Sequence, residues 1–310
     1  MPKAKRRGRS YGVLLGSFVF FAALLFGTSL ALPYLTGLRV EHIPASASIM
    51  FQPWMDLVPS TADAVDFTNV SWALAEGLNV SASSPILNIY QTGQTLTFAN
   101  TTYLVSYAIP NSNPKNNETG VDIFKPSEGA YASLQSTINA SSIVGRQDYR
   151  GVTIYYVVNN VTGGDLVTAR IAFYGGFIMY SQTPGDPTAQ VRAGLDVALD
   201  RETSLFANRT VQLSVYAVAG NGTNYLALHY IGYGAEINGS NFAAKAVTGT
   251  GADFQALYAF GFNTSSLASS KSNLVTSTYQ HGLDYYLLDN YVVAKVPVYS
   301  EELLIMLMAF

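Results

Sequence analysis

The feature that most constrains this chain is a long apolar segment near its start. Residues 11–32 read YGVLLGSFVFFAALLFGTSLAL and contain no charged side chain. A helix of this length is about 33 Å long, close to the hydrocarbon thickness of a bilayer at about 30 Å. A buried helix of a soluble domain would show a polar stripe, and this segment shows none. The pattern predicts one transmembrane helix over residues 11–32, with membrane lipid as its partner.

The charges around this segment predict its direction. Cytoplasmic flanks of transmembrane helices carry an excess of Lys and Arg. Five basic residues lie in the first ten positions, and the first acidic residue is Glu41. We therefore expect residues 1–10 to form a cytoplasmic tail and the chain after residue 32 to lie outside the cytoplasm. The residues that determine this topology are Lys3, Lys5, Arg6, Arg7 and Arg9.

Two other interpretations of the N-terminus stay open. Small residues at Ser29 and Ala31 would suit cleavage of a secretory signal peptide after Ala31. A pilin-like leader cut after Arg7-Gly8 would instead leave the apolar helix as a filament core. The apolar run is longer than the usual 7–15 residues of a signal peptide, about 22 here, which favours a retained anchor.

Composition limits what the outer part can bind. Charged residues make up 12% of the chain, against about 25% in ordinary soluble domains. Beyond the basic tail, 12 basic residues stand against 20 acidic ones, a balance that argues against nucleic-acid binding. The chain has no cysteine, which excludes disulfides, thiolate metal sites and cysteine nucleophiles. No cofactor or metal is indicated.

Ten Asn-x-Ser/Thr sequons follow the apolar segment. The region is rich in Asn, Ser and Thr, so composition alone would produce some of them. Sequons are used only on translocated, exposed segments, and their number here favours a glycosylated ectodomain. The candidate glycosylation sites are Asn69, Asn79, Asn100, Asn117, Asn139, Asn160, Asn208, Asn221, Asn238 and Asn263.

Few charges, many Tyr, Ser, Thr and Asn residues, no cysteine, many sequons and one anchor occur together here. In this combination the chain resembles single-pass, glycosylated cell-surface proteins of acidophilic, thermophilic archaea. A physical reason supports the resemblance, because carboxylates titrate in strong acid and ion pairs are then lost. A surface of hydroxyls, amides and glycans does not depend on pH in that way. The resemblance covers the whole chain, and no motif carries it.

The sequence after the apolar segment predicts an α+β fold outside the membrane, with antiparallel sheet and interspersed helices. Residues 33–46 form a linker, and residues 47–310 form an extracytoplasmic domain, with two subdomains, 47–145 and 146–310, as an option. A loose similarity between residues 165–181 and 288–300 suggests two related halves. Short runs rich in Val, Ile, Tyr and Phe predict strands. These runs are 86–90, 102–109, 152–158, 166–173, 177–181, 211–219, 225–231 and 255–262.

Helices separate these strands. The clearest predicted helix covers residues 187–207, with Asp186 as its cap, Pro187 at its first position and an Arg192–Asp196 pair on its surface. A second helix covers 128–139 and is capped by Ser127. Shorter helices are expected at 71–78, 241–247 and 264–273. The apolar tail 303–310 is too short to span a bilayer and predicts a helix end packed on the domain.

No motif in the sequence defines a catalytic centre. The three histidines, His42, His229 and His281, are far apart and lack zinc-binding spacing. Neither the nucleophile elbow Gly-x-Ser-x-Gly nor a P-loop occurs, and Gly249-Thr250-Gly251 predicts only a turn.

Two sets of side chains remain as candidates for a site. The carboxylates comprise Asp196, Asp200 and Glu202 on the predicted long helix, with Asp284 and Asp289 around a tyrosine pair. The tyrosine pairs 155–156 and 285–286 would suit sugar stacking, although Tyr is also a preferred residue of half-buried strands.

We therefore expect a non-enzymatic glycoprotein of the cell surface that binds, or assembles with, a protein partner or further copies of itself. An extracytoplasmic hydrolase whose site has no recognisable motif is the first alternative. A filament or surface-layer subunit, with the apolar helices packed together, is the second.

Overall fold

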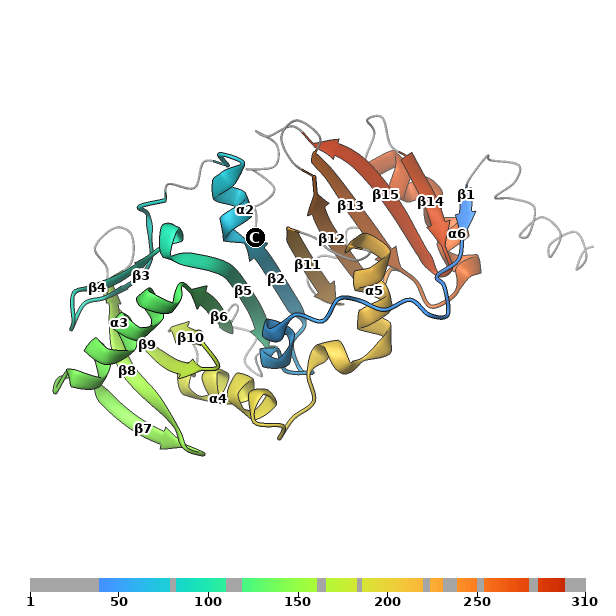
Figure 1. Ribbon diagram of the computed structural model, residues 1–310. Coiled ribbons are helices and arrows are strands. Elements are labelled where there is room, and N and C mark those ends of the chain that lie inside the picture. The colour runs from blue at the N-terminus through green and yellow to red at the C-terminus, as the bar shows by residue number, and fades with distance from the viewer. Residues whose placement is uncertain are drawn as a thin grey trace, which may run out of the picture.

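We describe a computed structural model of the 310-residue chain (Figure 1). The predicted transmembrane helix, the basic tail and the apolar tail at 303–310 lie outside the described residues. The residues that the structure describes are 39–78, 82–109, 119–160, 166–182, 186–219, 224–230, 239–249, 254–278 and 284–298.

All described strands belong to one sheet. Their order across it is β1-β14-β15-β13-β12-β11-β2-β5-β6-β10-β9-β8-β3-β4, and β7 pairs with β8 beside this path. The sheet runs from β1 at one end to β4 and β7 at the other (Figure 1). The strands are β1 (Arg39–Glu41), β2 (Ala64–Asn69), β3 (Pro85–Ile89), β4 (Gln94–Thr97), β5 (Thr101–Ile109), β6 (Thr119–Pro126), β7 (Gly145–Tyr149), β8 (Val152–Asn160), β9 (Leu166–Tyr174), β10 (Phe177–Gln182), β11 (Tyr225–Tyr230), β12 (Phe242–Thr248), β13 (Phe254–Gly261), β14 (Asp284–Leu288) and β15 (Tyr291–Val298).

Neighbouring strands of the main path are antiparallel, except for β1, which runs parallel to β14. The hairpin from β9 to β10 turns at Gly175-Gly176, where both residues have positive φ, as two-residue hairpins require. The predicted α+β fold with antiparallel sheet is therefore confirmed. Strands from 47–145 and from 146–310 join the same sheet, where β6 pairs with β10.

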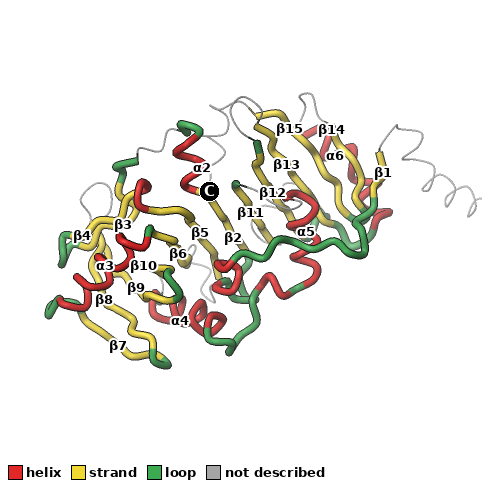
Figure 2. Tube along the Cα trace, in the orientation of Figure 1, coloured by secondary structure: helices red, strands yellow, loops and turns green. Residues whose placement is uncertain are grey.

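Along the chain, the helices fall between groups of strands, and in space they lie against the sheet (Figure 2). No helix in the described ranges is both long and apolar enough to cross a bilayer. The helices are η1 (Pro53–Leu57), α2 (Val70–Ala75), η2 (Phe98–Asn100), α3 (Glu128–Ala140), α4 (Pro187–Ala198), η3 (Leu205–Ala207), α5 (Arg209–Ala219) and α6 (Ser265–Thr278).

The helices divide between the two faces of the sheet. Val191 and Leu195 of α4, and Val211 and Val215 of α5, belong to the largest core cluster, so we call this side the α4/α5 face. Side chains of α3, α2 and α6 belong to three smaller clusters on the other side, the α3/α6 face. The two faces differ in chemistry as well as in the number of clusters.

On the α4/α5 face, one line of paired residues crosses eight strands without a polar side chain. Each member is at most 6% exposed. Since successive residues of a strand point to opposite faces, residues paired across the sheet share a face. This apolar row consists of Ile154, Ala172, Met179, Ile123, Val105, Phe67, Leu226 and Ala246.

The side chains of the adjacent line of paired residues point to the α3/α6 face. The residues at the centre of this line are polar. Tyr180 of β10 pairs with Asp122 of β6, which pairs with Ser106 of β5 and then Asp66 of β2. Ala227 links Asp66 to Lys245 of β12. We call Tyr180, Asp122, Ser106, Asp66 and Lys245 the polar row. It separates the cluster under α3 from the clusters under α2 and α6.

Two predicted elements are wrong. Residues 211–219, predicted as a strand, form most of α5. Their apolar residues alternate, but the buried residues follow helical spacing, and the core of the α4/α5 face selects the helix; they are Val211, Ser214, Val215, Ala217 and Val218. Residues 241–247, predicted as a helix from their alanines, form β12, because pairing on both sides outweighs helix propensity.

Other predicted elements are largely confirmed. The long helix ends at Ala198 and is followed by the separate turn η3. Asp186 caps α4 through its carboxylate, which accepts bonds from the backbone N–H groups of Thr188 and Ala189. Ser127 occupies the N-cap position of α3 but makes no capping bond.

Candidate functional site: a pocket between β3 and the sheet

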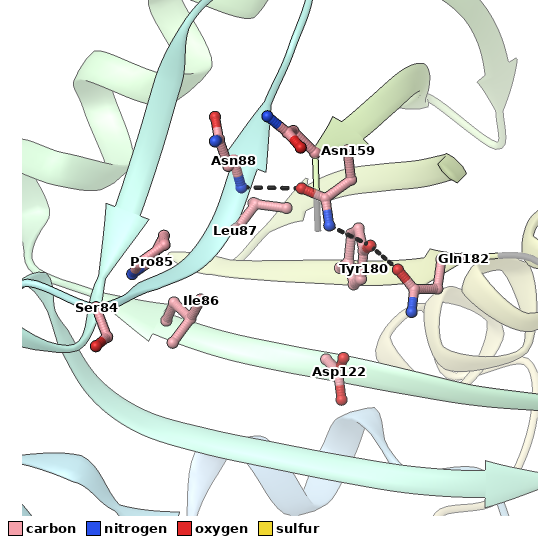
Figure 3. A pocket seen from close by; sticks show the side chains of 10 residues that line it. Ser84, Pro85, Ile86, Leu87, Asn88, Asp122, Asn159, Tyr180 and Gln182 are labelled. Carbon is pink, nitrogen blue, oxygen red and sulfur yellow. Dashed lines mark hydrogen bonds between the residues drawn. The ribbon is translucent and has the colours of Figure 1, made fainter. Parts of the chain in front are cut away.

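A cavity of about 540 Å³ opens between β3 and the end of the polar row (Figure 3). Small-molecule sites in proteins commonly fall between about 300 and 1,000 Å³. The cavity lies on the α3/α6 face, where Tyr180 and Asp122 meet the β3 strand. Its described lining consists of Ser84, Pro85, Ile86, Leu87, Asn88, Asp122, Asn159, Asn160, Tyr180 and Gln182.

The cavity exists because β3 separates from its neighbour. β3 pairs with β8 at one position, Ile89 with Asn159, while it stays paired with β4 along its length. The register with β4 shifts between Pro85 and Leu87, so Ile86 is a bulge residue. Bulges bend a strand and are frequent beside binding sites. Past Asn88, in the direction of Ser84, the strand therefore lines a space.

A chain of hydrogen bonds fixes one wall of the cavity. The backbone N–H of Asn88 donates to Asn159 Oδ1 at 2.9 Å, and Asn159 Nδ2 donates to the Tyr180 hydroxyl at 2.8 Å. The Tyr180 hydroxyl donates in turn to Gln182 Oε1. Figure 3 shows these three bonds in sequence across β3, β8 and β10. These bonds hold the side-chain amides of Asn159 and Gln182 in place. Gln182 is the last residue in this series of hydrogen bonds, and its side chain is exposed.

Asp122 contributes the one carboxyl group among the described lining residues. The Ser106 hydroxyl donates to its Oδ1 at 2.5 Å. Burial raises the pKa of Asp122 above its usual range, and the bond from Ser106 opposes this increase in part. Burial likewise raises the pKa of Tyr180. Burial thus favours the protonated, uncharged forms of the Asp122 carboxyl and the Tyr180 hydroxyl in this wall of the cavity.

Asn160 contributes an unsatisfied acceptor to the lining of the cavity. Its Oδ1 atom is buried and has no hydrogen-bond partner among the residues that the structure describes. A buried acceptor without a donor costs about 1–3 kcal/mol. Turning the amide toward a donor inside the cavity would recover that cost, because no internal bond holds Oδ1 in place.

The polar row continues beyond the cavity to a second carboxyl group. Burial raises the pKa of Asp66 from 3.8 to about 7, and the charge of Lys245 lowers it in part. Lys245 is 8% exposed and places its Nζ atom 5.7 Å from the centre of the Tyr258 ring. Asp66 does not line the cavity, so the site holds one carboxyl group and not a converging pair.

The described lining can be compared with the arrangements that common hydrolases use. Glycoside hydrolysis ordinarily uses two carboxylates, and acyl transfer uses a nucleophile beside a base. The described lining contains neither arrangement. Within the described part of the chain, no group of three or more His, Asp or Glu side chains is placed to hold a metal ion.

The predicted glycosylation sites are spread over the molecule. Asn79, Asn117, Asn221 and Asn238 lie outside the described residues. Asn100, Asn139, Asn208 and Asn263 are exposed. Asn69 is half-buried and caps α2 by accepting a bond from the Trp72 N–H, and Asn160 lines the cavity.

The carboxylates considered from the sequence serve structural roles. Asp196 accepts bonds from the Tyr149 hydroxyl and lies 3.2 Å from Arg150 Nε, in place of the expected pair with Arg192. The Arg192 guanidinium stacks instead over the Tyr149 ring. Asp200 lies at the turn after α4, where its φ is positive.

Asp284 and Asp289 hold the linker onto the edge of the sheet. Arg39 Nη1 lies 3.8 Å from Asp284 Oδ2, and His42 Nδ1 lies 2.8 Å from Asp289 Oδ1. The backbone N–H of Ile43 also donates to Asp289. Residues 39–43 of the predicted linker are therefore part of the folded domain.

The tyrosine pairs do not form a sugar-binding platform at the cavity. Tyr155 is buried and donates to Asn139 Oδ1 at 2.5 Å, and Tyr156 is covered by the Arg170 guanidinium 4.0 Å from its ring centre. No motif or spacing in the sequence selects the residues that line the cavity. Only Asn160 stood out, and it did so as a sequon.

Comparison with known proteins places the fold but not the function. No protein-family model matches the chain, and no curated protein sequence matches it. Two crystal forms of TP0453, forms III and I, are similar in structure, with TM-scores of 0.51 and 0.50. They cover 84% and 82% of this chain, and 99% and 96% of their own, at 9% sequence identity. Likeness at this identity concerns the fold alone.

Proposed function

We propose that the chain is a membrane-anchored, extracytoplasmic glycoprotein that binds a small ligand in the cavity between β3 and the sheet. The observation that carries this proposal is the cavity itself, whose described walls are mostly amide, hydroxyl and aliphatic groups without a catalytic pair. A receptor or an accessory subunit needs such a site, whereas a hydrolase needs groups that this lining lacks.

The attachment of the linker supports membrane anchoring. Six residues lie between Leu32, the end of the apolar segment, and Arg39, the first residue of β1, so seven Cα–Cα steps join the two. A chain of that length spans at most about 25 Å. The β1–β14 edge would therefore lie close to the bilayer. The cavity, beside β3 toward the other end of the sheet, would face away from it (Figure 1).

The few ion pairs agree with the resemblance to surface proteins of acidophiles. The pairs Arg39–Glu41, Arg39–Asp284, His42–Asp289 and Arg150–Asp196 each include a side chain at least 45% exposed. Exposed pairs contribute about 0–1 kcal/mol each, so their loss in acid has little effect. Asp66 and Asp122, by contrast, have raised pKa values and favour the folded state in acid.

The membrane topology is tested by adding protease to intact cells that produce the full chain. We expect the domain to be degraded and the first ten residues, carrying an added epitope tag, to be protected until the membrane is permeabilised. Protection of both parts would overturn the extracytoplasmic assignment.

Ligand binding is tested by native mass spectrometry of the full chain extracted from its own membrane. We expect a small non-covalent adduct that is lost in Asn159→Leu, because Asn159 connects β3 to Tyr180. An adduct that survives this substitution would place the ligand elsewhere. Control spectra of Thr95→Ala, an exposed position on β4 outside the cavity lining, should match those of the unaltered chain.

A further inference from the structure

We propose that the cavity between β3 and the sheet binds an uncharged carbohydrate unit. This inference rests on the proposed binding function and names its ligand class. It depends on three features of the cavity: the donors and acceptors of its lining, the scarcity of charge there, and the aliphatic side chains of β3.

The lining presents donors and acceptors together. Four of the ten described lining residues are amides, Asn88, Asn159, Asn160 and Gln182. An amide side chain offers two N–H donors and a carbonyl acceptor. Each sugar hydroxyl also donates and accepts, so amides match it without any net charge. A phosphate or carboxylate ligand would need donors alone.

Charge at the cavity also favours a neutral ligand. No Lys, Arg or His belongs to the described lining, so an anion would find no counter-charge there. The one carboxyl group, Asp122, is held by Ser106 and is biased toward its neutral form by burial. A protonated carboxyl both donates and accepts, which again matches a hydroxyl.

The wall formed by β3 faces Asn159 and Gln182 and is aliphatic from Pro85 to Leu87, beside the amide of Asn88 (Figure 3). Pro85, Ile86 and Leu87 of β3 line it, and Leu87 is anchored in the cluster under α3. A sugar ring carries hydroxyls at its rim and C–H groups on its faces. Aliphatic side chains that face amides therefore suit a sugar unit inserted between them. The cavity volume lies within the usual range for small-molecule sites.

Two sources could supply the sugar. One is a free or partner-borne carbohydrate. The other is the glycan of this chain, because Asn160 both lines the cavity and opens the sequon Asn160-Val161-Thr162. The unsatisfied Oδ1 of Asn160 is a ready acceptor in either case. The experiment below separates the two sources.

The free-sugar arm uses the full chain produced without glycosylation and purified in a detergent that has no sugar headgroup. Saturation-transfer NMR and calorimetry would compare glucose, mannose, galactose and N-acetylglucosamine with glucuronate and glucosamine. We expect at least one neutral sugar to bind about tenfold or more tightly than both charged sugars.

A pair of variants tests the site. Gln182→Leu removes the exposed amide that ends the hydrogen-bond chain, and we expect it to weaken binding of the neutral sugar about tenfold. Gln94→Leu makes the same change on β4, outside the cavity lining, and should bind like the unaltered chain. Equal loss in both variants would contradict binding at this cavity.

The own-glycan arm uses the full chain produced with glycosylation. Thr162→Ala removes the sequon and keeps Asn160, and Ser265→Ala does the same for the exposed sequon at Asn263. If the cavity holds the chain's own sugar, the Asn160 glycan resists endoglycosidase in the folded protein. Thr162→Ala then lowers the melting temperature more than Ser265→Ala does.

The outcomes are distinct. Neutral-sugar binding lost in Gln182→Leu, or a protected and stabilising glycan at Asn160, supports the inference. Preferential binding of glucosamine, glucuronate or another charged compound at the cavity overturns the carbohydrate assignment and leaves the binding function standing. If nothing binds and the Asn160 glycan is absent or freely cleaved, the inference is overturned. If native adducts are absent as well, the proposed binding function fails with it.

Discussion

The two faces of the sheet are built from the same strands but differ in what they bury. On the α4/α5 face, the apolar row crosses eight strands and joins α4, α5 and η1 in one cluster. On the α3/α6 face, the polar row divides the apolar contacts into separate clusters. The cavity opens where the polar row meets β3.

The two faces make different contributions: one supplies apolar burial, and the other holds buried polar side chains. A continuous apolar face supplies most of the burial that holds a large sheet together. The other face can then carry Asp66, Asp122 and Lys245, whose burial reduces stability. Because successive residues of a strand alternate between faces, one sheet can carry an apolar core on one face and buried polar side chains on the other. Four experiments test whether the two faces differ in this way.

The largest effect is expected on the apolar row. Ile123 is fully buried at the centre of the sheet, and Ile123→Ala should lower the free energy of unfolding by about 2–5 kcal/mol. Urea denaturation of the full chain in detergent would measure it. The control Thr95→Ala, at an exposed position on β4, should change stability by less than about 0.5 kcal/mol. Equal effects of the two substitutions would contradict a dominant α4/α5 core.

The second effect is a pH dependence from the polar row. Asp66 binds its proton more tightly in the folded chain, with a pKa of about 7 against 3.8. The resulting stabilisation is complete below pH 4 and is lost as the pH rises toward 7, by at most about 4 kcal/mol. Asp66→Asn should flatten the fall of unfolding free energy between pH 4 and 8. Identical slopes for the variant and the unaltered chain would refute this role.

The third effect tests the bond between two strands of the polar row. Ser106→Ala removes the donor that opposes the raised pKa of Asp122. The bond favours the ionised form of Asp122, so the loss of stability should increase with pH and be larger at pH 8 than at pH 4. Denaturation curves at the two pH values would show it. A loss independent of pH would mean that the hydroxyl serves packing only.

The smallest effect compares helix caps on the two faces. Asp186→Ala removes two capping bonds from α4 on the α4/α5 face and should cost about 0.5–2 kcal/mol. Ser127→Ala at the start of α3 should cost less, because Ser127 makes no capping bond. Thermal denaturation would rank them. A larger loss at Ser127 would reverse the expected order.

Interactions between residues close in sequence make local features of the structure predictable. Asp186 with Pro187 identified the start of α4, and Gly175-Gly176, the turn from β9 to β10, has the positive φ that glycine adopts without strain. These signals depend on neighbouring residues alone, through positive φ and unsatisfied backbone N–H groups.

The candidate site could not be predicted in the same way. Its lining comes from β3, β6, β8 and β10, and Ser84 and Gln182 are far apart in sequence. The same limit explains why α5 and β12 were misassigned. Residues 211–219 suit both helix and strand periodicity, and the alanines of residues 242–248 favour a helix until β11 and β13 pair with them.

Local sequence patterns predicted the fold class, the positions of seven of the fifteen described strands, and the cap that begins α4. The sequence also carries the prediction of an anchor at residues 11–32, through an uncharged run that needs no tertiary partner to be recognised. Tertiary structure alone decided which residues share a face and where β3 leaves the sheet. The physical reason is that register across β2, β5, β6 and β10 aligns Asp66, Ser106, Asp122 and Tyr180, and no local pattern encodes that alignment.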